Sequence, residues 1–496
     1  MNASASRRGF VLPTVLIVLV LLTGMVYQFN EAMLNAAQRA AHNAEAARAE
    51  EAAFSGFPFA AARLHSARAR TAQEKEVAIT LSTAFQELPT PGDPRCGFRL
   101  IGREADSRFP DVVDESAKLN LNSLPLTAHE APRARNMLLA LPRMTPQLAD
   151  AVLDWIDSDD QPRQFGAERS YYFSAATTLP RNGRLDSLKE LLLVRGVTAD
   201  LLFGDSASRH DSARGWSEFL TVSSRESNRR DDGTAKIYLN QDDCVALYDE
   251  LVKQFDERTS LFLAALRRYG PMDDTTVEEL TEEQKRRAAQ LRAARQRGQL
   301  VDDDSAADRG PSRMRAGLEL NGRAGYVIRS WADVCGVRVR VRINDGDEVL
   351  ISPWPADREG LRRAHLELTP HVTPFAGVAV EGRINVAVAS VPVLMTLSGM
   401  TPETARAIAA AGEQVSDEGR QVCDPAWLLD RGFADWKTLQ GWLPLTTVRG
   451  DLVVLRSEGT AGGGRIRRRL TARIDIASQD WEILDRRITI DPAATK

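Results

Sequence analysis

The sequence has few of the residue patterns from which catalytic and metal sites are usually built. It holds only four cysteines and no C-x-x-C pair, so the ligands of a zinc ribbon and the dithiol of a thioredoxin-like site are missing. The six histidines form no H-E-x-x-H pattern, and no G-x-S-x-G, G-x-x-x-x-G-K-[ST] or G-x-G-x-x-G motif occurs. No residue is therefore predicted to be catalytic. One or two disulfides are left open among Cys96, Cys244, Cys335 and Cys423.

An excess of positive charge is also missing. The chain carries 64 Lys and Arg against 68 Asp and Glu, a net charge of -4, whereas proteins that coat DNA or RNA concentrate positive charge. A pervasive nucleic-acid coat protein is therefore excluded. The apolar content of 43% is that of an ordinary globular protein, and 496 residues correspond to three domains at about 150 residues each.

One long uncharged run stands near the start of the chain. Residues 10–29 (FVLPTVLIVLVLLTGMVYQF) contain no charged side chain, and at ~1.5 Å per helical residue they span the ~30 Å hydrocarbon core of a bilayer. A cleaved secretory signal fits less well, because its apolar core is usually ~7–15 residues long and ends at a small-residue site. Arg7 and Arg8 precede the run, which predicts a cytoplasmic N-terminus and a bulk outside the cytoplasm.

The residues before this run resemble a processing site. Arg7, Arg8, Gly9 and Phe10, followed by an apolar helix, are similar to the class III signal of type IV pilins and pseudopilins. The resemblance implies that a prepilin peptidase cuts after Gly9 and that the mature chain begins with a methylated Phe10. The alternative is an uncleaved signal anchor that keeps its basic pair.

The fifth residue of such a mature chain is Thr14, where the pilin family usually has glutamate. In a stacked filament that carboxylate neutralises the terminal amine of a neighbouring subunit, because an unpaired charge in an apolar bundle is costly. A subunit at the very tip has no earlier neighbour and can lose the acid. Among pseudopilins, the K-type minor pseudopilin of type II secretion typically lacks it, although a degenerate anchor would lose it equally well.

The apolar run continues into residues 30–78, which are rich in Ala, Glu and Arg and are expected to form a solvated helical spine. Gly56 and Pro58 predict a kink or break in this helix near Phe57, because proline cannot donate a helical hydrogen bond. Beyond the spine, short alternating runs indicate loops and strands.

Three later segments resemble one another and begin at Ala117 (AKLNLN), Ala235 (AKIYLN) and Gly382 (GRINVA). Each has a small residue, then a cation, then Leu or Ile, and each precedes an apolar helical stretch. Duplicated small helical modules are therefore predicted. Asn120 and Asn122 are expected to hold a turn by bonding nearby backbone rather than to take part in chemistry.

The first and third copies share a second feature. Residues 141–146 (LPRMTP) align with 397–402 (LSGMTP), and Thr145 and Thr401 are natural helix N-caps with proline at the next position. The third copy resembles a helix-hairpin-helix element, whose hairpin can point backbone N–H groups at a DNA phosphate. Packing of two helices is the alternative role of this hairpin, and the net acidic charge favours packing.

A further set of residues lies between positions 107 and 204. It comprises Asp114, residues 118–122 (KLNLN), 154–157 (DWID), 166–168 (GAE), Tyr171, Tyr172, Asn182 and residues 188–192 (LKELL). Together they resemble the helical insertion of the K-type minor pseudopilins of type II secretion. The resemblance implies an α+β pseudopilin fold with a long N-terminal transmembrane and spine helix, a small antiparallel sheet, and large inserted helical domains of SAM-like or helix-hairpin-helix-like form.

These signals predict a linear organisation of the chain. Its parts are a leader peptide at 1–9, a transmembrane helix at 10–29, a helical spine at 30–78, a pilin-like strand and loop region at 79–113, a first helical module at 114–205, a second repeat-like module at 206–275, a charged helix and linker at 276–316, a strand-rich segment at 317–380, a third helical module at 381–445 and C-terminal strands at 446–496. The region from 206 to 380 departs from the family.

Four carboxylates follow the first helical pair, at Asp157, Asp159, Asp160 and Glu168. Ca²⁺ takes about six to eight oxygen ligands, which such a loop can partly supply. The loop is not an EF-hand, because Pro162 stands where glycine is required. K-type pseudopilins bind calcium in this insertion, so the resemblance implies a Ca²⁺ site here. The alternative is a solvated acidic turn.

The resemblance implies a non-enzymatic assembly subunit, anchored in the inner membrane, that initiates and caps the periplasmic pseudopilus of type II secretion. Its expected partners are the I-type and J-type minor pseudopilins, the major pseudopilin and the prepilin peptidase, with the secretin and secreted cargo as further candidates. Two alternatives share some of these signals. One is a tip minor pilin of a type IV pilus, and the other is a membrane-anchored DNA-binding protein for DNA uptake.

Overall fold

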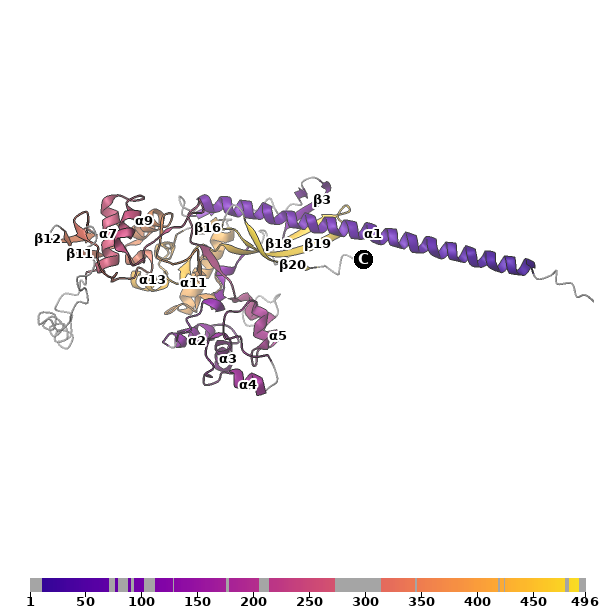
Figure 1. The fold of residues 1–496 in the computed structure, drawn as a ribbon, viewed down its shortest axis with the longest axis horizontal. Helices are drawn as coiled ribbons and strands as arrows, with labels where there is room; N and C mark the ends of the chain where they lie inside the picture. The colour runs from indigo at the N-terminus through magenta and orange to yellow at the C-terminus, as the bar shows by residue number, and fades with distance from the viewer. Residues whose placement is uncertain are drawn as a thin grey trace, which may run out of the picture.

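One helix, α1 (Val11–Arg70), runs through the first part of the chain and carries the rest of the molecule near its C-terminal end (Figure 1). The computed structural model describes residues 11–70, 76–78, 88–90, 93–101, 112–127, 129–174, 178–204, 214–272, 314–343, 346–417, 420–422, 424–477 and 481–489. Gly9 and Phe10 of the expected processing site lie outside these residues, as does most of the expected charged helix and linker.

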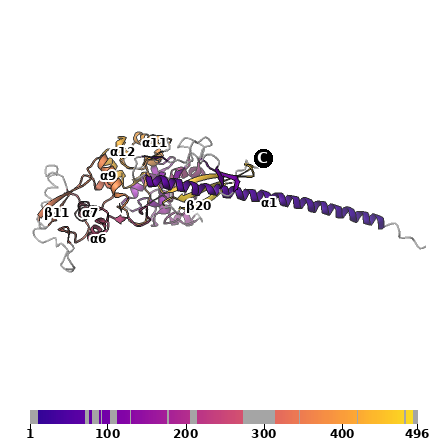
Figure 2. The same cartoon turned by 90° about the horizontal axis from the view of Figure 1, so that it is seen from above.

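The first half of α1 projects away from the head, which is the part of the molecule formed by all elements after α1 (Figures 1 and 2). The side chains of residues 12–44, Thr14 among them, are exposed. In the described part of the chain, α1 is long and apolar enough to cross a membrane, with a mean hydropathy of 2.0 over its most apolar stretch. The chain thus has an N-terminal helix suited to a single-pass membrane anchor.

The second half of α1 lies on an antiparallel sheet with the strand order β2-β3-β18-β19-β20, and β4 pairs with β18 as well. The strands are β2 (Leu88–Thr90), β3 (Asp93–Leu100), β4 (Val113–Asp114), β18 (Leu452–Ala461), β19 (Ile466–Asp475) and β20 (Glu482–Thr489). Strands from both ends of the chain therefore form one sheet, and about 340 residues are inserted between β4 and β18. This arrangement confirms the expected α+β class with large insertions.

Small residues let α1 approach this sheet closely. A Cβ atom on Gly56 would lie 2.3 Å from Ser457 Oγ, and one on Gly459 would lie 2.0 Å from a backbone oxygen of α1.

The helix break predicted near Phe57 is absent, since α1 continues through Pro58. Burial of Phe57 against the sheet offsets the hydrogen bond that Pro58 cannot donate.

The spine is shorter than predicted. Helix α1 ends at Arg70, and β1 (Glu76–Ala78) pairs antiparallel with β16 (Arg420–Val422) of the third module. The last residues of the expected spine, 30–78, are therefore a strand. The pairing is long-range in sequence, so local composition could not reveal it.

Three helical modules make up the insertion, and each closes with a pair of short parallel strands. The pairs are β5 (Leu119–Asn120) with β6 (Leu220–Thr221), β8 (Ile237–Tyr238) with β13 (Val372–Thr373), and β15 (Ile384–Asn385) with β17 (Thr446–Thr447). The first strand of each pair lies in one of the three repeated segments, so these segments hold equivalent places in the three modules. Strands β7 (Arg225–Ser227) and β14 (Ala379–Glu381) pair antiparallel between the modules.

The modules are longer than the sequence indicated. The first closes at β6, beyond the expected end at 205, and the second runs from β8 to β13 instead of ending at 275. The strand-rich segment expected at 317–380 is therefore part of the second module. Each closing strand has only two residues, too few to show an alternating pattern.

The helices of each module are short. The first module holds α2 (Ala131–Leu139), α3 (Pro146–Ile156), α4 (Arg169–Ser174) and α5 (Ala199–Phe203). The second holds α6 (Cys244–Leu251), α7 (Glu257–Tyr269) and α9 (Arg358–Leu368), with β9 (Met314–Arg315), β10 (Leu318–Glu319), β11 (Arg338–Ile343) and β12 (Gly346–Ile351) in one sheet. The third holds α10 (Val391–Leu394), α11 (Pro402–Asp417), α12 (Trp427–Asp430) and α13 (Trp436–Trp442). One continuous apolar core joins the three modules.

The cysteines do not form a disulfide framework in the described part of the chain. Cys96, Cys244 and Cys335 are all buried, and Cys244 and Cys335 are free thiols. Cys423 lies outside the described residues.

Candidate metal centre in the first helical module

Helix α3 places the acidic residues of the first module. Thr145 caps it, since Thr145 Oγ1 accepts a hydrogen bond from Leu148 N at 3.3 Å, and Pro146 takes the first helical position. Val152 and Trp155, three residues apart on one face of α3, are buried. The last turn of α3 also holds Asp154, and Asp157 caps the helix at the start of the next loop.

Three carboxylates meet where α3 ends. Asp154 lies in the last turn, Asp157 is the C-cap residue, and Glu168 comes back from the following loop. One oxygen of each lies within 4.8 Å of the others. Their residues are buried, with exposed fractions of 0%, 5% and 1%. Three acids in so small a buried volume repel one another unless positive charge lies between them.

Arg163 supplies part of that positive charge. Its Nη1 atom donates to Asp154 Oδ1 at 2.6 Å and also to Asp157 Oδ2, and its backbone N–H donates to Asp154 Oδ2 at 3.2 Å. The loop between these acids folds tightly over Asp154, because a Cβ atom on Gly166 would lie 1.7 Å from Asp154 Oδ2. One guanidinium thus serves two of the three carboxylates.

The remaining oxygens have no protein donor. Both carboxylate oxygens of Glu168, and Oδ1 of Asp157, are buried without a hydrogen-bond partner among the described residues. Burial, followed by repulsion from Asp154 and Asp157, raises the pKa of Glu168 to about 7. Burial also raises the pKa of Asp154 and of Asp157 above the usual value, although Arg163 opposes both shifts. Unpaired buried oxygens of this kind fit a bound cation.

The four residues predicted as metal ligands divide into two pairs. Asp157 and Glu168 converge, but Asp159 and Asp160 stay on the exposed loop. Asp159 Oδ1 accepts from Gln161 N at 2.8 Å, and Asp160 Oδ1 accepts from Asn182 Nδ2 at 3.0 Å. Asp159 thus holds a local turn, whereas Asp160 joins this loop to Asn182.

Sequence reasoning missed Asp154 as a member of this acidic cluster. The signal was present, because Asp154 and Asp157 are three residues apart and residues at that spacing share a helix face. An acid facing the same way as a predicted ligand on a buried helix is unusual unless it is paired. The acidic cluster is hereafter Asp154, Asp157 and Glu168.

The comparison with known families bears on this same stretch. Residues 117–203 match the family described as Type II secretion system (T2SS), protein K. This stretch is similar to the protein K family. It contains α2 to α5 and the whole acidic cluster, so the resemblance to K-type minor pseudopilins is confirmed over the first module.

Two further comparisons concern the whole chain. No curated protein matches the chain. Among solved structures, one match is the crystal structure of the GspK-GspI-GspJ complex from the type 2 secretion system of enterotoxigenic Escherichia coli. The identity is 12%, the alignment covers 91% of this chain and 100% of that chain, and the TM-score is 0.36.

Proposed function

We propose that this chain is the K-type minor pseudopilin that initiates and caps a periplasmic pseudopilus in type II secretion. The proposal rests on where the three modules lie. In two perpendicular views, α7 and β11 lie beyond the C-terminal end of α1, opposite its projecting apolar half (Figures 1 and 2). In Figure 1, α2 to α5 extend to one side.

This arrangement supports a place at the tip for a steric reason. Pseudopilin subunits associate through their N-terminal helices, and a subunit placed above this one would need the volume that the second module fills. Below the head, the exposed apolar half of α1 remains available to neighbouring helices or to the membrane. Growth of the filament is then possible only from below.

The membrane arrangement and partners follow from the same proposal. The helix anchors the chain in the inner membrane, with Arg7 and Arg8 on the cytoplasmic side and the head in the periplasm. Prepilin peptidase cuts between Gly9 and Phe10, and the new terminal amine is methylated. The nearest partners are the I-type and J-type minor pseudopilins, followed by the major pseudopilin. The role is structural rather than enzymatic, and the protein K match favours it over DNA uptake.

We also propose that the acidic cluster holds Ca²⁺. Ca²⁺ binds oxygen ligands at about 2.3–2.6 Å, so oxygens on opposite sides of one ion are separated by roughly 4.8 Å, and the cluster oxygens lie within that distance. The unpaired oxygens of Asp157 and Glu168 are available as ligands. Together with Arg163, the ion would neutralise the three acids, and it would join α3 to the loop before α4.

Site-specific photocrosslinking in secreting cells tests the place at the tip. A photoreactive phenylalanine analogue replaces either Leu16, on the projecting half of α1, or Val349, on β12 of the second module. Both side chains are exposed, at 62% and 47%. We expect Leu16 to crosslink to other pseudopilins and Val349 to crosslink to none of them. A pseudopilin captured at Val349 as efficiently as at Leu16 would place a subunit above the head and refute the cap.

Mass spectrometry of the protein from membranes tests the processing step. With active prepilin peptidase, the expected mass is that of a chain beginning at methylated Phe10. A peptidase-deficient strain should retain residues 1–9. An intact chain in both strains would mean an uncleaved anchor.

A further inference from the structure

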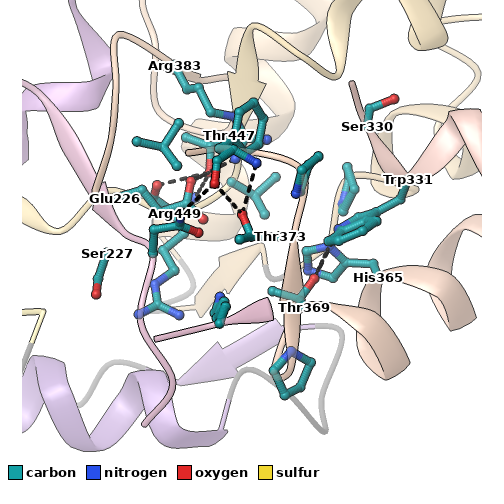
Figure 3. Close-up of a pocket in the computed structure, with 18 of the residues that line it drawn as sticks. Glu226, Ser227, Ser330, Trp331, His365, Thr369, Thr373, Arg383, Thr447 and Arg449 are labelled. Carbon is teal, nitrogen blue, oxygen red and sulfur yellow. Dashed lines mark hydrogen bonds and ion pairs between the residues drawn. The ribbon is translucent and has the colours of Figure 1, made fainter. Parts of the chain in front are cut away.

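A cavity lies where the second and third modules meet the β7–β14 ladder, well apart from the acidic cluster in sequence. Its volume is about 140 Å³. Figure 3 shows Arg383, Glu226 and Thr447 on one wall and Trp331 and His365 on the other. We call it the module-interface cavity.

Cations outnumber acids around the module-interface cavity. Five basic side chains line it, against two carboxylates. The basic residues are Arg229, Arg230, Lys236, Arg383 and Arg449, and the acids are Glu226 and Asp231. Burial lowers the pKa of His365 to about 4, so this histidine is neutral at pH 7 and adds no charge. The excess positive charge favours an anionic occupant.

The repeated segments explain where two of these cations come from. Lys118, Lys236 and Arg383 hold the same place in the three repeats, immediately before the first closing strand of each module. Lys118 Nζ lies 3.3 Å from Glu115 Oε1, and Arg383 Nη1 lies 2.9 Å from Glu226 Oε2. The cation of the first and third copies is thus paired with a glutamate.

Lys236 differs from its two counterparts. It makes no hydrogen bond or ion pair within the part of the chain that the structure describes, although it is half-buried. Burial lowers the pKa of the Lys236 ammonium, with Glu226 opposing that shift from a distance. The Nε–H groups of Arg230 and Arg383 are also buried without an acceptor among the described residues. Two buried unsatisfied donors and the unpaired Lys236 therefore belong to residues that line one cavity, and unpaired buried donors are costly.

Ser330 Oγ, also in the lining, is buried without a hydrogen-bond partner among the described residues, whereas the aromatic residues of the lining present apolar surface. Phe375 lies under the Arg383 guanidinium, 5.0 Å from it, and Trp331 Nε1 donates to Thr369 Oγ1 at 3.1 Å. The indole and phenyl faces thus present carbon to the cavity. A cavity of about 150 Å³ can hold benzene, so this one accommodates a group of similar size.

We propose that the module-interface cavity binds a carboxylate carried on a small apolar group. The carboxylate accepts from Lys236 and from the free Nε–H groups of Arg230 and Arg383, while the apolar group contacts Trp331 and Phe375. Two sources present this chemistry, a free aromatic or aliphatic acid and the last residue of a peptide chain. Binding would hold the second and third modules together, because the donors come from both.

Fluorine NMR of the full-length chain in lipid nanodiscs tests this proposal, with empty nanodiscs to subtract partition into lipid. The probes are 4-fluorobenzoate and its neutral analogue 4-fluorobenzamide. We expect the benzoate to bind at least tenfold more tightly than the benzamide. Raising NaCl from about 0.1 M to about 0.5 M should weaken benzoate binding severalfold. Equal affinity for the two probes would overturn the proposal.

A matched pair of variants assigns the binding to Lys236. Lys236→Met should weaken benzoate binding at least tenfold, whereas Lys437→Met removes the same charge from an exposed position on α13 and should change it less than twofold. If circular dichroism shows that Lys236→Met is unfolded, Arg230→Gln takes its place, with at least a threefold loss expected. Unchanged binding in the folded variant would refute the site.

Peptides distinguish the two sources of the carboxylate. The tetrapeptide Ala-Ala-Ala-Phe is compared with its C-terminally amidated form in competition with 4-fluorobenzoate. Displacement by the free peptide alone identifies a peptide C-terminus as an occupant. Displacement by neither peptide, with benzoate still bound, supports a free organic acid. No benzoate binding and no peptide binding would overturn the proposal for both sources, and this outcome leaves the place at the tip untouched.

Discussion

Asn122 and Asn240 make the same three hydrogen bonds in two successive modules. Asn122 Oδ1 accepts from Leu185 N, and its Nδ2 donates to Leu185 O and Val222 O, at 2.7–2.9 Å. In the second module, Ile328 and Pro374 provide the equivalent backbone groups to Asn240, again at 2.7–2.9 Å. Each amide thus joins its closing strand to a distant loop. Ala387 stands at this position in the third repeat and has no such group.

We expect Asn122→Ala to lower the free energy of unfolding by about 2–3 kcal/mol, because it leaves buried backbone groups of Leu185 and Val222 without partners. Urea unfolding followed by circular dichroism measures the change. Asn136→Ala, on the exposed face of α2, is the control and should cost less than about 0.5 kcal/mol. A loss no larger than that of the control would show that the Asn122 bonds do not stabilise the module.

Glu168 should make the metal-free protein less stable at neutral pH than at acidic pH. Its pKa is about 7 in the folded state against an ordinary value of 4.5, so the folded chain retains a proton that the unfolded chain releases. The free energy of unfolding therefore falls as pH rises from about 4.5 to about 7 and levels off above that. Glu168→Gln should raise metal-free stability at pH 8 by at most about 3 kcal/mol and flatten this pH profile.

With Ca²⁺ bound, Glu168 should stabilise the folded chain instead of destabilising it. At a concentration of about 100 times the dissociation constant, Ca²⁺ should stabilise the parent chain by about 2.7 kcal/mol, and Glu168→Gln should lose most of this gain. Thermal unfolding at pH 5 to 8 measures the metal-free stability in EGTA and the added stabilisation in Ca²⁺. Glu413→Gln, on the exposed surface of α11, should behave like the parent. An equal calcium response in the two variants would contradict the metal site.

Arg163 bonds Asp154 Oδ1 and Asp157 Oδ2, whereas the unpaired oxygens are Asp157 Oδ1 and both oxygens of Glu168. The guanidinium and a bound cation would nevertheless place two positive charges in one small acidic cluster and repel each other. Arg163→Gln should therefore bind Ca²⁺ about tenfold more tightly by calorimetry. The metal-free variant should lose about 3 kcal/mol of stability, since Asp154 keeps a buried charge without its partner. Arg181→Gln removes exposed ion pairs with Asp186 and Glu190 and should change stability far less than Arg163→Gln does. Weaker calcium binding by Arg163→Gln would mean that Arg163 supports the site instead of repelling the cation.

Thr14→Glu tests the tip from the membrane side. A carboxylate at this position has no subunit above it to neutralise, and a buried unpaired charge in an apolar bundle costs about 3 kcal/mol. We expect at least tenfold less of the variant to copurify with the other minor pseudopilins, and secretion to fall with it. Thr14→Val keeps the shape without the charge and should assemble normally. Normal assembly of Thr14→Glu would indicate that its carboxylate finds a neighbouring amine.

Helices and turns, which depend on neighbouring residues, were predictable from the sequence. The strand pairs that close each module join residues far apart in the chain and were not. The Ala-rich composition predicted α1, and Thr145 and Pro146 predicted the start of α3 where the structure has it. Arg143 and Gly399, which align in the two hairpins, both have positive φ, 62° and 75°, so the matching loops adopt a shared backbone turn. The closing strands β6, β13 and β17 were missed, since two-residue strands carry no periodic signal.

The candidate sites show the same division. Asp157 and Glu168 are close in sequence and were predicted together as metal ligands. The three-dimensional arrangement of α3 and the following loop was needed to show that Asp154 belongs to the same cluster. The module-interface cavity had no sequence signal beyond the repeated cation, because its lining comes from segments between residues 226 and 449.

The sequence by itself determined the membrane helix and the triple repeat. Transfer of an apolar run into lipid depends on composition, and a repeated segment folds alike wherever it occurs. Only the tertiary structure decided that α1 continues through Pro58, that Asp154 and Asp157 meet at Arg163, and that Lys236 and Arg383 line one cavity. These outcomes depend on packing between elements far apart in the chain. Burial then sets the cost of each unpaired charge, and no local pattern contains that information.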